Sequence, residues 1–490
     1  MYHITDIKKM ERCERLFWLS RRVQKSFTPY VQYTESMTSL MKERLLLPND
    51  CFEGQANDDP ALALQAFAEK KPLVNARFAY EDLRIKVPVL IQEEGKTILY
   101  MSYRSCYPKE QEAQYIADII AVLQLLDIRI DEIYAIHLNA EYIRGKTLDV
   151  HALLTISDHF YNSHNRPGKN IFQLVQMKLR DIRPLLENMR ILDALDEIKP
   201  KRTSFCTRGN KCSFYKECFQ EESQPGAITN LVQSQHKYAM KEEGIQRLKD
   251  ADLDRIEGTR HQYAQIMADT YGGLYVDVAA LKTWRKDHIS YPLSYLDFEW
   301  ETYAFPPYEG MKPFDVLTFQ FSLHVEEEKG KTLQHTGFIG EKDCRLAFIE
   351  ALLASVPKTG TILVYNMEGA EKLRLVQLAQ QFPQYEKALM QIWERMVDLS
   401  LPFSTGNVYD VRMAGLFSLK TLVPIFSSYH YEDLAISYGL DAVAKWREYQ
   451  ESEGTKKQQI YEELTQYCAM DTYAEYVVYH GLIKEVEKDA

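Results

Sequence analysis

The spacing of four cysteines constrains the N-terminal part of this chain more than any other feature of its sequence. Cys206, Cys212 and Cys218 form a C-x5-C-x5-C motif within thirteen residues, and Cys13 lies far upstream. A tetrahedral metal centre needs four ligands, and three clustered ligands plus one distant ligand join the two ends of a domain. We therefore predict a metal centre that closes the N-terminal domain. Ligation by thiolates alone is typical of an iron–sulfur cluster or of Zn²⁺.

The alternative is that these four residues are ordinary free thiols. The chain has only eight cysteines, so three of them in such a short segment argue against that alternative. The other four show no ligand spacing and are most simply interpreted as buried thiols. They are Cys51, Cys106, Cys344 and Cys468.

The sequence shows no segment that would direct the chain to a membrane. Its first 22 residues carry charges throughout and lack the apolar core of a signal peptide. The longest apolar stretch, Ile116 to Leu126, is interrupted by Asp118 and Gln124 and is too short to span a bilayer. We therefore expect a cytoplasmic protein without a membrane partner, in which cysteines are thiols or metal ligands rather than disulfides.

Composition allows a large protein with more than one core. A length of 490 residues corresponds to about two or three domains. Apolar residues make up 46% and charged residues 26%, which excludes an intrinsically disordered chain. The formal charge of −11 argues against a positive coat of the histone type. It still permits a local basic groove and a site rich in carboxylates.

The segments that carry the clustered cysteines are themselves basic. Residues 1–26 contain seven Lys and Arg against three acids, and residues 174–212 contain nine against five. A positive surface around a metal centre would suit contacts with phosphate. The alternative is that both segments are solvated helix faces.

Hydrophobic patterns divide the chain into three parts: residues 1–222, a charged helical connector over 223–290, and residues 291–490. In the first part they predict a hairpin over 77–106 with a turn at Glu94-Gly95, a buried helix over 114–127, a strand pair around 132–142 with a turn at Arg144-Gly145, and an amphipathic stretch over 170–195. In the last part they predict strands at 294–300, 316–325 and 333–340, a helix over 342–355, a strand at 361–366, and then helices. The last part has the outline of an RNase H-like α/β domain.

Two acids in a predicted strand indicate a second metal site. Asp297 and Glu299 lie in the segment SYLDFEW, and residues i and i+2 of a strand point to the same side. Burying two acids on one side is costly unless a cation compensates their charge. Short acid pairs also occur at strand ends without a ligand. The helical segment with Tyr467 and Asp471, spaced i and i+4 on one face, therefore adds weight to the site.

The cysteine pattern resembles that of the iron–sulfur RecB-like nucleases. In those proteins one N-terminal and three C-terminal cysteines of a PD-(D/E)XK domain hold a 4Fe-4S cluster. The resemblance implies that Cys13, Cys206, Cys212 and Cys218 bind such a cluster, with Zn²⁺ as the alternative.

Most of the chain also resembles a bacterial family of unknown function, domain of unknown function 2779. That family joins a RecB-like domain to a DnaQ-like exonuclease domain. The resemblance implies an α/β chain with an N-terminal RecB-like (restriction-endonuclease-like) domain over 1–222. It also implies a C-terminal RNase H-like exonuclease domain over 291–490.

The acids of the last part resemble those of the DEDDy exonucleases in the DnaQ-like superfamily. The resemblance implies a site for two Mg²⁺ or Mn²⁺ ions in which Asp297 bridges both ions and Glu299 holds one. Asp471 would hold a metal from the opposite side, and Tyr467 would orient the attacking water.

The second motif of this superfamily needs one more acid, which follows the strand at 361–366. Glu368 and Glu371 are both candidates, and the spacing to the next Arg-Leu pair favours Glu371 as the catalytic and metal-binding residue. Asp398 resembles a supporting acid beside the site rather than a ligand.

The N-terminal domain departs from the PD-(D/E)XK pattern at its catalytic positions. A working site needs an Asp on one hairpin strand and a Glu-x-Lys on the next. Pro88 takes the place of the aspartate, and Ser102-Tyr103-Arg104 take the place of Glu-x-Lys. Gln111 and Tyr115 form a Gln-x3-Tyr that lies too close to the hairpin to match the family's helix. We therefore expect an inactive site in a basic platform that binds nucleic acid.

These patterns together predict a metal-dependent nuclease, specifically a 3′–5′ exonuclease on single-stranded DNA or RNA ends. Its acids would act on a phosphate backbone, so base specificity should be low. The alternative is a non-catalytic nucleic-acid-binding protein that keeps a structural iron–sulfur or zinc site.

Overall fold

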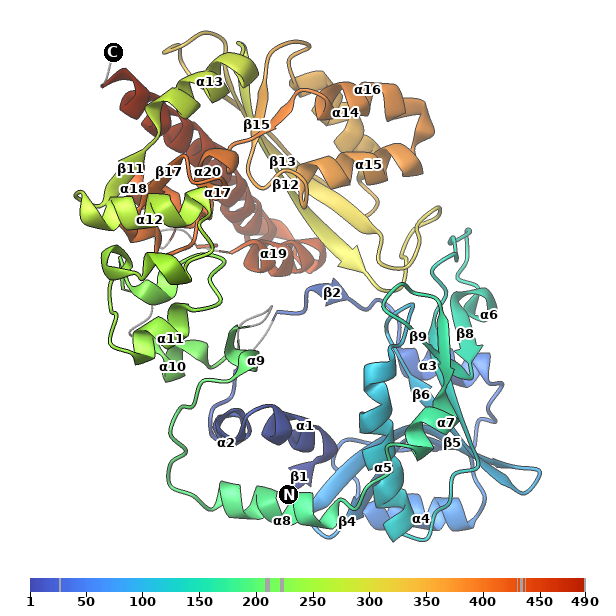
Figure 1. Ribbon diagram of the computed structural model, residues 1–490. Helices are drawn as coiled ribbons and strands as arrows, with labels where there is room; N and C mark the ends of the chain where they lie inside the picture. Colours follow the sequence, from blue (N-terminus) through green and yellow to red (C-terminus); the bar gives the residue numbers. More distant parts are fainter. Residues whose placement is uncertain are drawn as a thin grey trace. The chain divides into compact units, whose positions relative to one another are not determined.

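The computed structural model (Figure 1) describes residues 1–25, 28–207, 212–220, 224–429, 431, 435–436 and 438–488. The chain is of the mixed α/β class, as predicted, and it divides into two compact units. Unit 1 comprises Met1–Phe27, Val31–Phe219 and Tyr303–Asp315; unit 2 comprises Thr28–Tyr30, Gln220–Thr302 and Val316–Ala490. The segment 223–290, expected as a separate connector, falls within unit 2.

Unit 1 is built around a mixed sheet in the order β3-β4-β5-β6-β7-β8, with β1 paired to β5. Strands β4, β5 and β6 are antiparallel, whereas β7 runs parallel to β6 after the crossover helix α5. The strands of the unit are β1 (Tyr2–His3), β2 (Val31–Gln32), β3 (Phe52–Glu53), β4 (Leu73–Tyr80), β5 (Leu83–Glu93), β6 (Lys96–Ser102), β7 (Glu132–Leu138), β8 (Leu154–Ser157), β9 (His159–Tyr161) and β10 (Pro167–Asn170).

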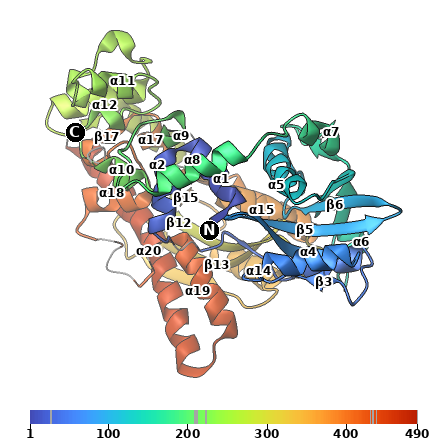
Figure 2. The same cartoon turned by 90° about the horizontal axis from the view of Figure 1, so that it is seen from below.

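Helix α5 (Ala113–Leu125) is buried on more than one face, as its apolar sequence predicts. It packs on β4 and β5 (Figure 2) and shares its core with α1 and α8. The other helices of the unit are α1 (Ile4–Arg12), α2 (Glu14–Arg22), α3 (Met37–Arg44), α4 (Pro60–Ala68), α6 (Val150–Leu153), α7 (Ile171–Gln176), α8 (Arg183–Asp193), α9 (Ser204–Thr207) and α10 (Tyr215–Cys218).

The predicted hairpin over 77–106 is correct at its turn and wrong at its start. Glu94 and Gly95 both have positive φ, 49° and 80°, and join β5 to β6 as a two-residue hairpin turn. The segment expected as one strand before that turn contains the end of β4 and most of β5. A second reversal divides them at Glu81, whose φ is 51°.

Two other regions of unit 1 are more complex than the sequence pattern indicated. β7 pairs with β8, which begins at Leu154 after α6 rather than directly after Arg144-Gly145, and the N–H of Arg144 donates to the carbonyl of the distant Met311. The amphipathic stretch over 170–195 contains two helices, α7 and α8. Pro184 in the first turn of α8 starts a new helix, because proline suits a helix start and disrupts a helix interior.

Unit 2 is built around a sheet that contains neighbouring strands in the order β14-β13-β12-β15-β16. The three strands predicted after Tyr291 are β12, β13 and β14; they are antiparallel, and β15 and β16 then add in parallel. The strands of the unit are β11 (Leu274–Val276), β12 (Leu293–Tyr303), β13 (Val316–Glu326), β14 (Gln334–Ile339), β15 (Ile362–Val364), β16 (Met396–Asp398) and β17 (Val408–Asp410).

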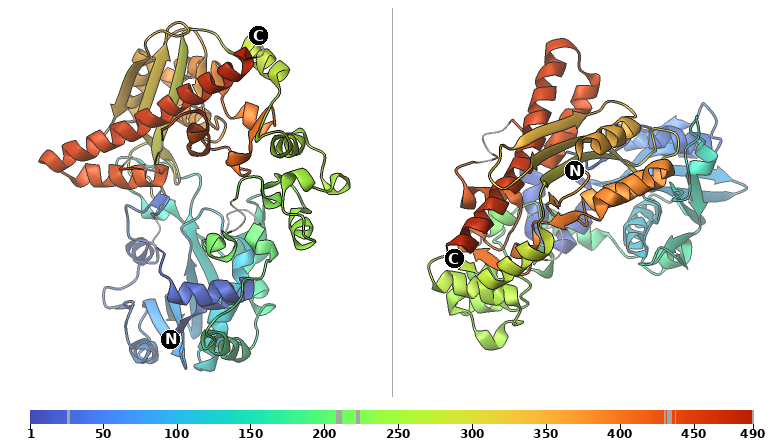
Figure 3. Two further views of the ribbon diagram at one scale, coloured as in Figure 1. Left: turned by 90° about the vertical axis from the view of Figure 1, so that its left-hand side faces the viewer. Right: turned by 90° about the horizontal axis from the view of Figure 1, so that it is seen from above.

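Alternate residues of β12 face different layers of unit 2. Leu296 and Phe298 pack in a core with helices α14, α15 and α16. Tyr295, by contrast, contacts Tyr476 and Tyr479 of α20, which runs along β13 and β14 (Figure 3). The two-residue period of a strand therefore directs Asp297 and Glu299 toward the α20 side.

The remaining helices of unit 2 lie before and after these strands. They are α11 (Lys237–Glu242), α12 (Arg260–Thr270), α13 (Val278–His288), α14 (Arg345–Ser355), α15 (Glu371–Gln381), α16 (Glu386–Trp393), α17 (Leu401–Ser404), α18 (Leu419–Phe426), α19 (Gly439–Glu451) and α20 (Gly454–Glu487). In the described part of the chain, no helix has both the length and the apolar character needed to cross a membrane.

Candidate metal centre

Three of the predicted acids converge in unit 2. Carboxylate oxygens of Asp297 and Glu299 on β12 and of Asp471 on α20 lie within 4.8 Å of one another. Glu299 and Asp471 are buried, and Asp297 is partly exposed. One cluster therefore joins Asp297 and Glu299, which are one strand period apart, with Asp471, which follows some 170 positions later. Such a set of oxygen ligands suits a hard divalent cation.

Burial and mutual repulsion shape the charge state of this acid cluster. Burial is the main cause that raises the pKa of Asp297 and of Glu299 well above the usual range, and neighbouring carboxylates add to it. Burial likewise raises the pKa of Asp471 to about 6. A bound cation would reverse this tendency, because it stabilises the ionised carboxylates.

The expected Tyr467 lies in the same site, one helical turn before Asp471. It is buried, and its pKa is raised first by burial and then by the charges of Asp471, Glu299 and Asp297. Its hydroxyl in turn favours the ionised form of Asp471. The structure therefore brings together the strand pair and the helix pair that the sequence suggested.

The two candidates for the second-motif acid differ sharply in position. Glu371 begins α15, is 2% exposed, and acts electrostatically on Asp297 and Glu299. The side chain of Glu368 is 76% exposed and pairs with Lys372 at 3.4 Å. Glu371 is therefore the acid of the two that faces the site.

Asp398 holds backbone near the site. Its carboxylate accepts hydrogen bonds from the N–H groups of Asn366, Met367 and Ser400 at 3.1, 3.2 and 2.8 Å. It therefore fixes the connection after β15, from which Glu371 enters the site. This is the supporting place expected for it.

Sequence patterns missed Lys420 of α18. Its charge acts on Asp471, Glu299 and Asp297, and burial lowers its pKa. Its ammonium group lies 4.3 Å from the ring centroid of Tyr438 and 5.7 Å from that of Tyr467. Lys420 therefore contributes positive charge at the acid cluster. A lone lysine in an apolar helix has no spacing that would have revealed this role.

Tyr431 and Glu475 were also missed. The hydroxyl of Tyr431 donates a 2.6 Å hydrogen bond to Oδ1 of Asp471. Glu475 follows Asp471 by one turn of α20, is 1% exposed, and acts on Asp297, Glu371 and Asp471. Among the described residues, neither Oε2 of Glu475 nor Oε2 of Glu371 has a hydrogen-bond partner. The i+4 spacing from Asp471 is the sequence feature that could have identified Glu475.

Glu299 faces the start of another helix. Gly439 is the first residue of α19, and a Cβ placed on it would stand 3.7 Å from Oε2 of Glu299. The N-terminal end of a helix carries partial positive charge, which favours an ionised carboxylate at this position.

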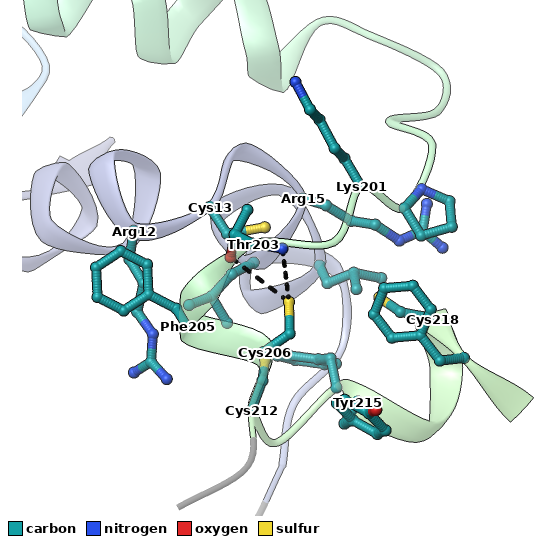
Figure 4. A pocket seen from close by; sticks show the side chains of 15 residues that line it. Arg12, Cys13, Arg15, Lys201, Thr203, Phe205, Cys206, Cys212, Tyr215 and Cys218 are labelled. Carbon is teal, nitrogen blue, oxygen red and sulfur yellow. Dashed lines mark hydrogen bonds between the residues drawn. The ribbon is translucent and has the colours of Figure 1, made fainter. Parts of the chain in front are cut away.

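The four predicted cysteines line one pocket of unit 1 (Figure 4). Cys13 lies between α1 and α2, whereas Cys206, Cys212 and Cys218 come from the segment after α8. Cys206 is buried and the other three are partly buried. Cys13 and Cys212 act electrostatically on Cys218, whose pKa is raised chiefly by burial.

The wall of this cysteine pocket is apolar and cationic. Its other lining residues are Arg12, Arg15, Leu16, Leu19, Pro200, Lys201, Thr203, Phe205, Phe214, Tyr215 and Phe219. The described lining thus contains no acid and no histidine, so its sulfur atoms are the groups that could hold a metal ion. Cationic neighbours compensate the negative charge that several thiolates would bring.

The residues predicted to replace the PD-(D/E)XK catalytic positions lie on β5 and at the end of β6. Pro88 is within β5, Ser102 ends β6, and Tyr103 and Arg104 follow directly. Gln111 lies in a short 3-10 turn, and Tyr115 lies in the first turn of α5.

The chain was compared with protein families, curated proteins and solved structures. Neither a curated protein nor a solved structure matches it significantly. Residues 294–418 match the model of a family described as "Domain of unknown function (DUF2779)". The matched segment begins at β12, includes Asp297, Glu299 and Glu371, and ends before α18. This match supports the predicted DUF2779 family for residues 294–418 of the chain.

Proposed function

We propose that unit 2 is a metal-dependent phosphodiesterase, specifically a 3′–5′ exonuclease that acts on single-stranded nucleic-acid ends. The observation that carries this proposal is the convergence of Asp297, Glu299 and Asp471 within 4.8 Å. Buried acids at this density need a compensating cation, and clustered carboxylates are how two-metal phosphodiesterases hold their ions.

The order of the elements supports a DnaQ-like, RNase H-like domain. Three antiparallel strands are followed by parallel strands, with helices on one face and α20 along the other. The acids come from the first strand, from the region after the fourth strand, and from the last helix. This is the chain order of a DEDDy site, with a glutamate, Glu371, in the second motif.

The residues have distinct roles in this proposal. Two Mg²⁺ or Mn²⁺ ions, when bound, would activate the attacking water and neutralise the leaving oxygen. Asp297, Glu299 and Asp471 would hold them, with Glu371 on the second motif. The Tyr467 hydroxyl would position the attacking water, and Tyr431 fixes the orientation of the Asp471 carboxylate through its 2.6 Å bond.

We also propose that unit 1 is a RecB-like domain that binds a 4Fe-4S cluster through Cys13, Cys206, Cys212 and Cys218. An all-sulfur donor set in an apolar, cationic pocket suits such a cluster. A single tetrahedral Zn²⁺ held by the same four sulfurs is the alternative.

One preparation tests both proposals. Anaerobically purified protein should be brown, contain iron and sulfide, and shorten 5′-labelled single-stranded DNA or RNA from the 3′ end when Mg²⁺ or Mn²⁺ is supplied. Zinc at one equivalent without visible absorbance would replace the cluster with a zinc site. If the protein binds single strands but digests neither DNA nor RNA, the alternative of a binding protein replaces the exonuclease.

A further inference from the structure

Basic side chains gather on one face of the hairpin strands in unit 1. Arg77 of β4 stands directly opposite Lys86 of β5, and Ala79 stands opposite Arg84. Their neighbours Phe78, Ile85 and others are buried in the core on the other face of the sheet. Strand alternation therefore places Arg77, Arg84 and Lys86 together on the face away from that core.

Arg104, just beyond β6, completes this group. Partial burial is the main cause that lowers the pKa of Lys86, and the charges of Arg77 and Arg104 add to it. The guanidinium of Arg104 lies over the ring of Tyr33, 4.2 Å from the ring centroid. We call Arg77, Arg84, Lys86 and Arg104 the cationic strand face.

Acids do not neutralise this face. In the described part of the chain, none of the four residues makes an ion pair with a carboxylate. Asp58 acts on Arg77, but its carboxylate already accepts the N–H of Gln55 at 2.6 Å. Like charges directly opposite each other destabilise a strand pair unless an anion lies between them.

The residues next to the cationic strand face indicate what kind of ligand it could bind. Pro88 lies on β5, which also carries Arg84 and Lys86. Ser102 ends β6 just before Arg104, and neither Pro88 nor Ser102 supplies a carboxylate for a metal ion. A phosphate at this place would meet cations directly. Arginine offers a planar fork of N–H donors that matches phosphate oxygens, and lysine adds a point charge.

We propose that the cationic strand face binds the phosphodiester backbone of a nucleic acid without a metal ion. The inference rests on the proposed function only for the choice of a nucleic acid as the polyanion. Contacts of this kind read charge and spacing rather than base sequence. The site would therefore hold the strand on unit 1 independently of the acid cluster on unit 2.

The test is fluorescence anisotropy of the full-length protein with labelled oligo-dT and oligo-rU, in EDTA and at several salt concentrations. Lys86→Glu and Arg77→Glu should each weaken binding about tenfold or more and make the salt slope shallower by about 0.7 per lost phosphate contact. Lys146→Glu and Arg166→Glu are matched controls, because both residues are exposed and in unit 1, and they should change affinity less than about twofold.

Neutral variants keep the test informative if a charge reversal disturbs the fold. Lys86→Gln and Arg77→Gln should also weaken binding while their melting temperatures stay unchanged. The inference is overturned if these variants bind like the controls, or if binding to wild type requires Mg²⁺. It is also overturned if they weaken competition by pyrophosphate but not oligonucleotide binding, which would assign the site to a small phosphate compound.

Hydrolysis separates this inference from the proposed function. If the wild-type protein binds through Lys86 but digests nothing, the cationic strand face is supported and the exonuclease proposal is rejected. If the protein digests single strands while Lys86→Glu and Arg77→Glu bind normally, the exonuclease proposal is supported and the cationic strand face is rejected.

Discussion

The hydroxyl of Tyr431 donates a 2.6 Å hydrogen bond to Oδ1 of Asp471, and both residues are buried. A carboxylate held in this way has a fixed orientation beside Asp297 and Glu299. The bond therefore orders one carboxylate of the acid cluster before any cation binds, which lowers the entropic cost of binding a cation.

Loss of any one carboxylate of the cluster should abolish hydrolysis. We expect Asp297→Asn, Glu299→Gln and Asp471→Asn each to lower kcat by at least about 100-fold, because each removes charge that stabilises the transition state. Rates on 5′-labelled single strands measure the effect. Glu368→Gln, which alters an exposed acid nearby, is the control and should retain wild-type rates. Near-normal activity in Asp471→Asn would place the site elsewhere.

The two tyrosines should have smaller and distinguishable effects. Tyr467→Phe removes a hydroxyl proposed to position water, so kcat should fall about 10-fold while Mn²⁺ affinity is retained. Tyr431→Phe removes the hydrogen bond to Asp471, so it should chiefly weaken Mn²⁺ binding. Calorimetric titration with Mn²⁺ beside the rate assay separates the effects. Equal losses of metal binding in both variants would contradict this division.

Glu371 and Glu475 should matter for the number of ions bound. Both are buried acids with an oxygen that lacks a hydrogen-bond partner among the described residues. We expect Glu371→Gln and Glu475→Gln to reduce binding from two Mn²⁺ ions to one, because each removes negative charge that a second ion would need. Titration by electron paramagnetic resonance counts the ions. If both variants still bind two ions, these acids are protonated core residues and not metal ligands.

The raised pKa of Asp471 predicts how stability depends on pH. With a pKa of about 6 in the folded state against 3.8 in a model compound, the folded protein holds this proton to higher pH than the unfolded chain does. Without metal, its contribution to stability is therefore lost as pH rises from about 4 through 6. Melting in EDTA should show this decline, and Asp471→Asn should flatten it.

Metal should reverse that trend, because the ionised carboxylate is the form that binds a cation. We expect the rise in Tm caused by Mn²⁺ to be larger at about pH 7.5 than at about pH 5. An equal rise at both pH values would show that Asp471 takes no part in metal binding.

Cys13→Ser should destabilise unit 1 as a whole. Through the proposed metal centre Cys13 would join α1 and α2 to the segment after α8, so its loss would remove a cross-link between distant parts of the chain. We expect loss of visible absorbance, of iron and of several degrees in Tm. Cys51→Ser, at a partly buried cysteine outside the pocket, is the matched control and should keep the cluster. Retained iron in Cys13→Ser would remove Cys13 from the ligand set.

Short-range regularities in the sequence determined much of this protein. The two-residue period of a strand places Asp297 and Glu299 on one side, and the i, i+4 spacing of a helix aligns Tyr467 with Asp471. The same local rules located the strands after Tyr291 and the hairpin turn at Glu94-Gly95. These features depend on backbone geometry alone, so the sequence carries them directly.

Only the tertiary structure decided which distant residues meet. Lys420 and Tyr431 reach the acid cluster because unit 2 packs α18 against α20, and no spacing relates them to Asp297. The choice between Glu368 and Glu371 needed the direction in which α15 starts. The N–H of Arg144 donates to the carbonyl of Met311, far away in the sequence, and β7 pairs with β8 only after the intervening α6. Such contacts depend on the free energy of packing the whole unit, which local patterns do not contain.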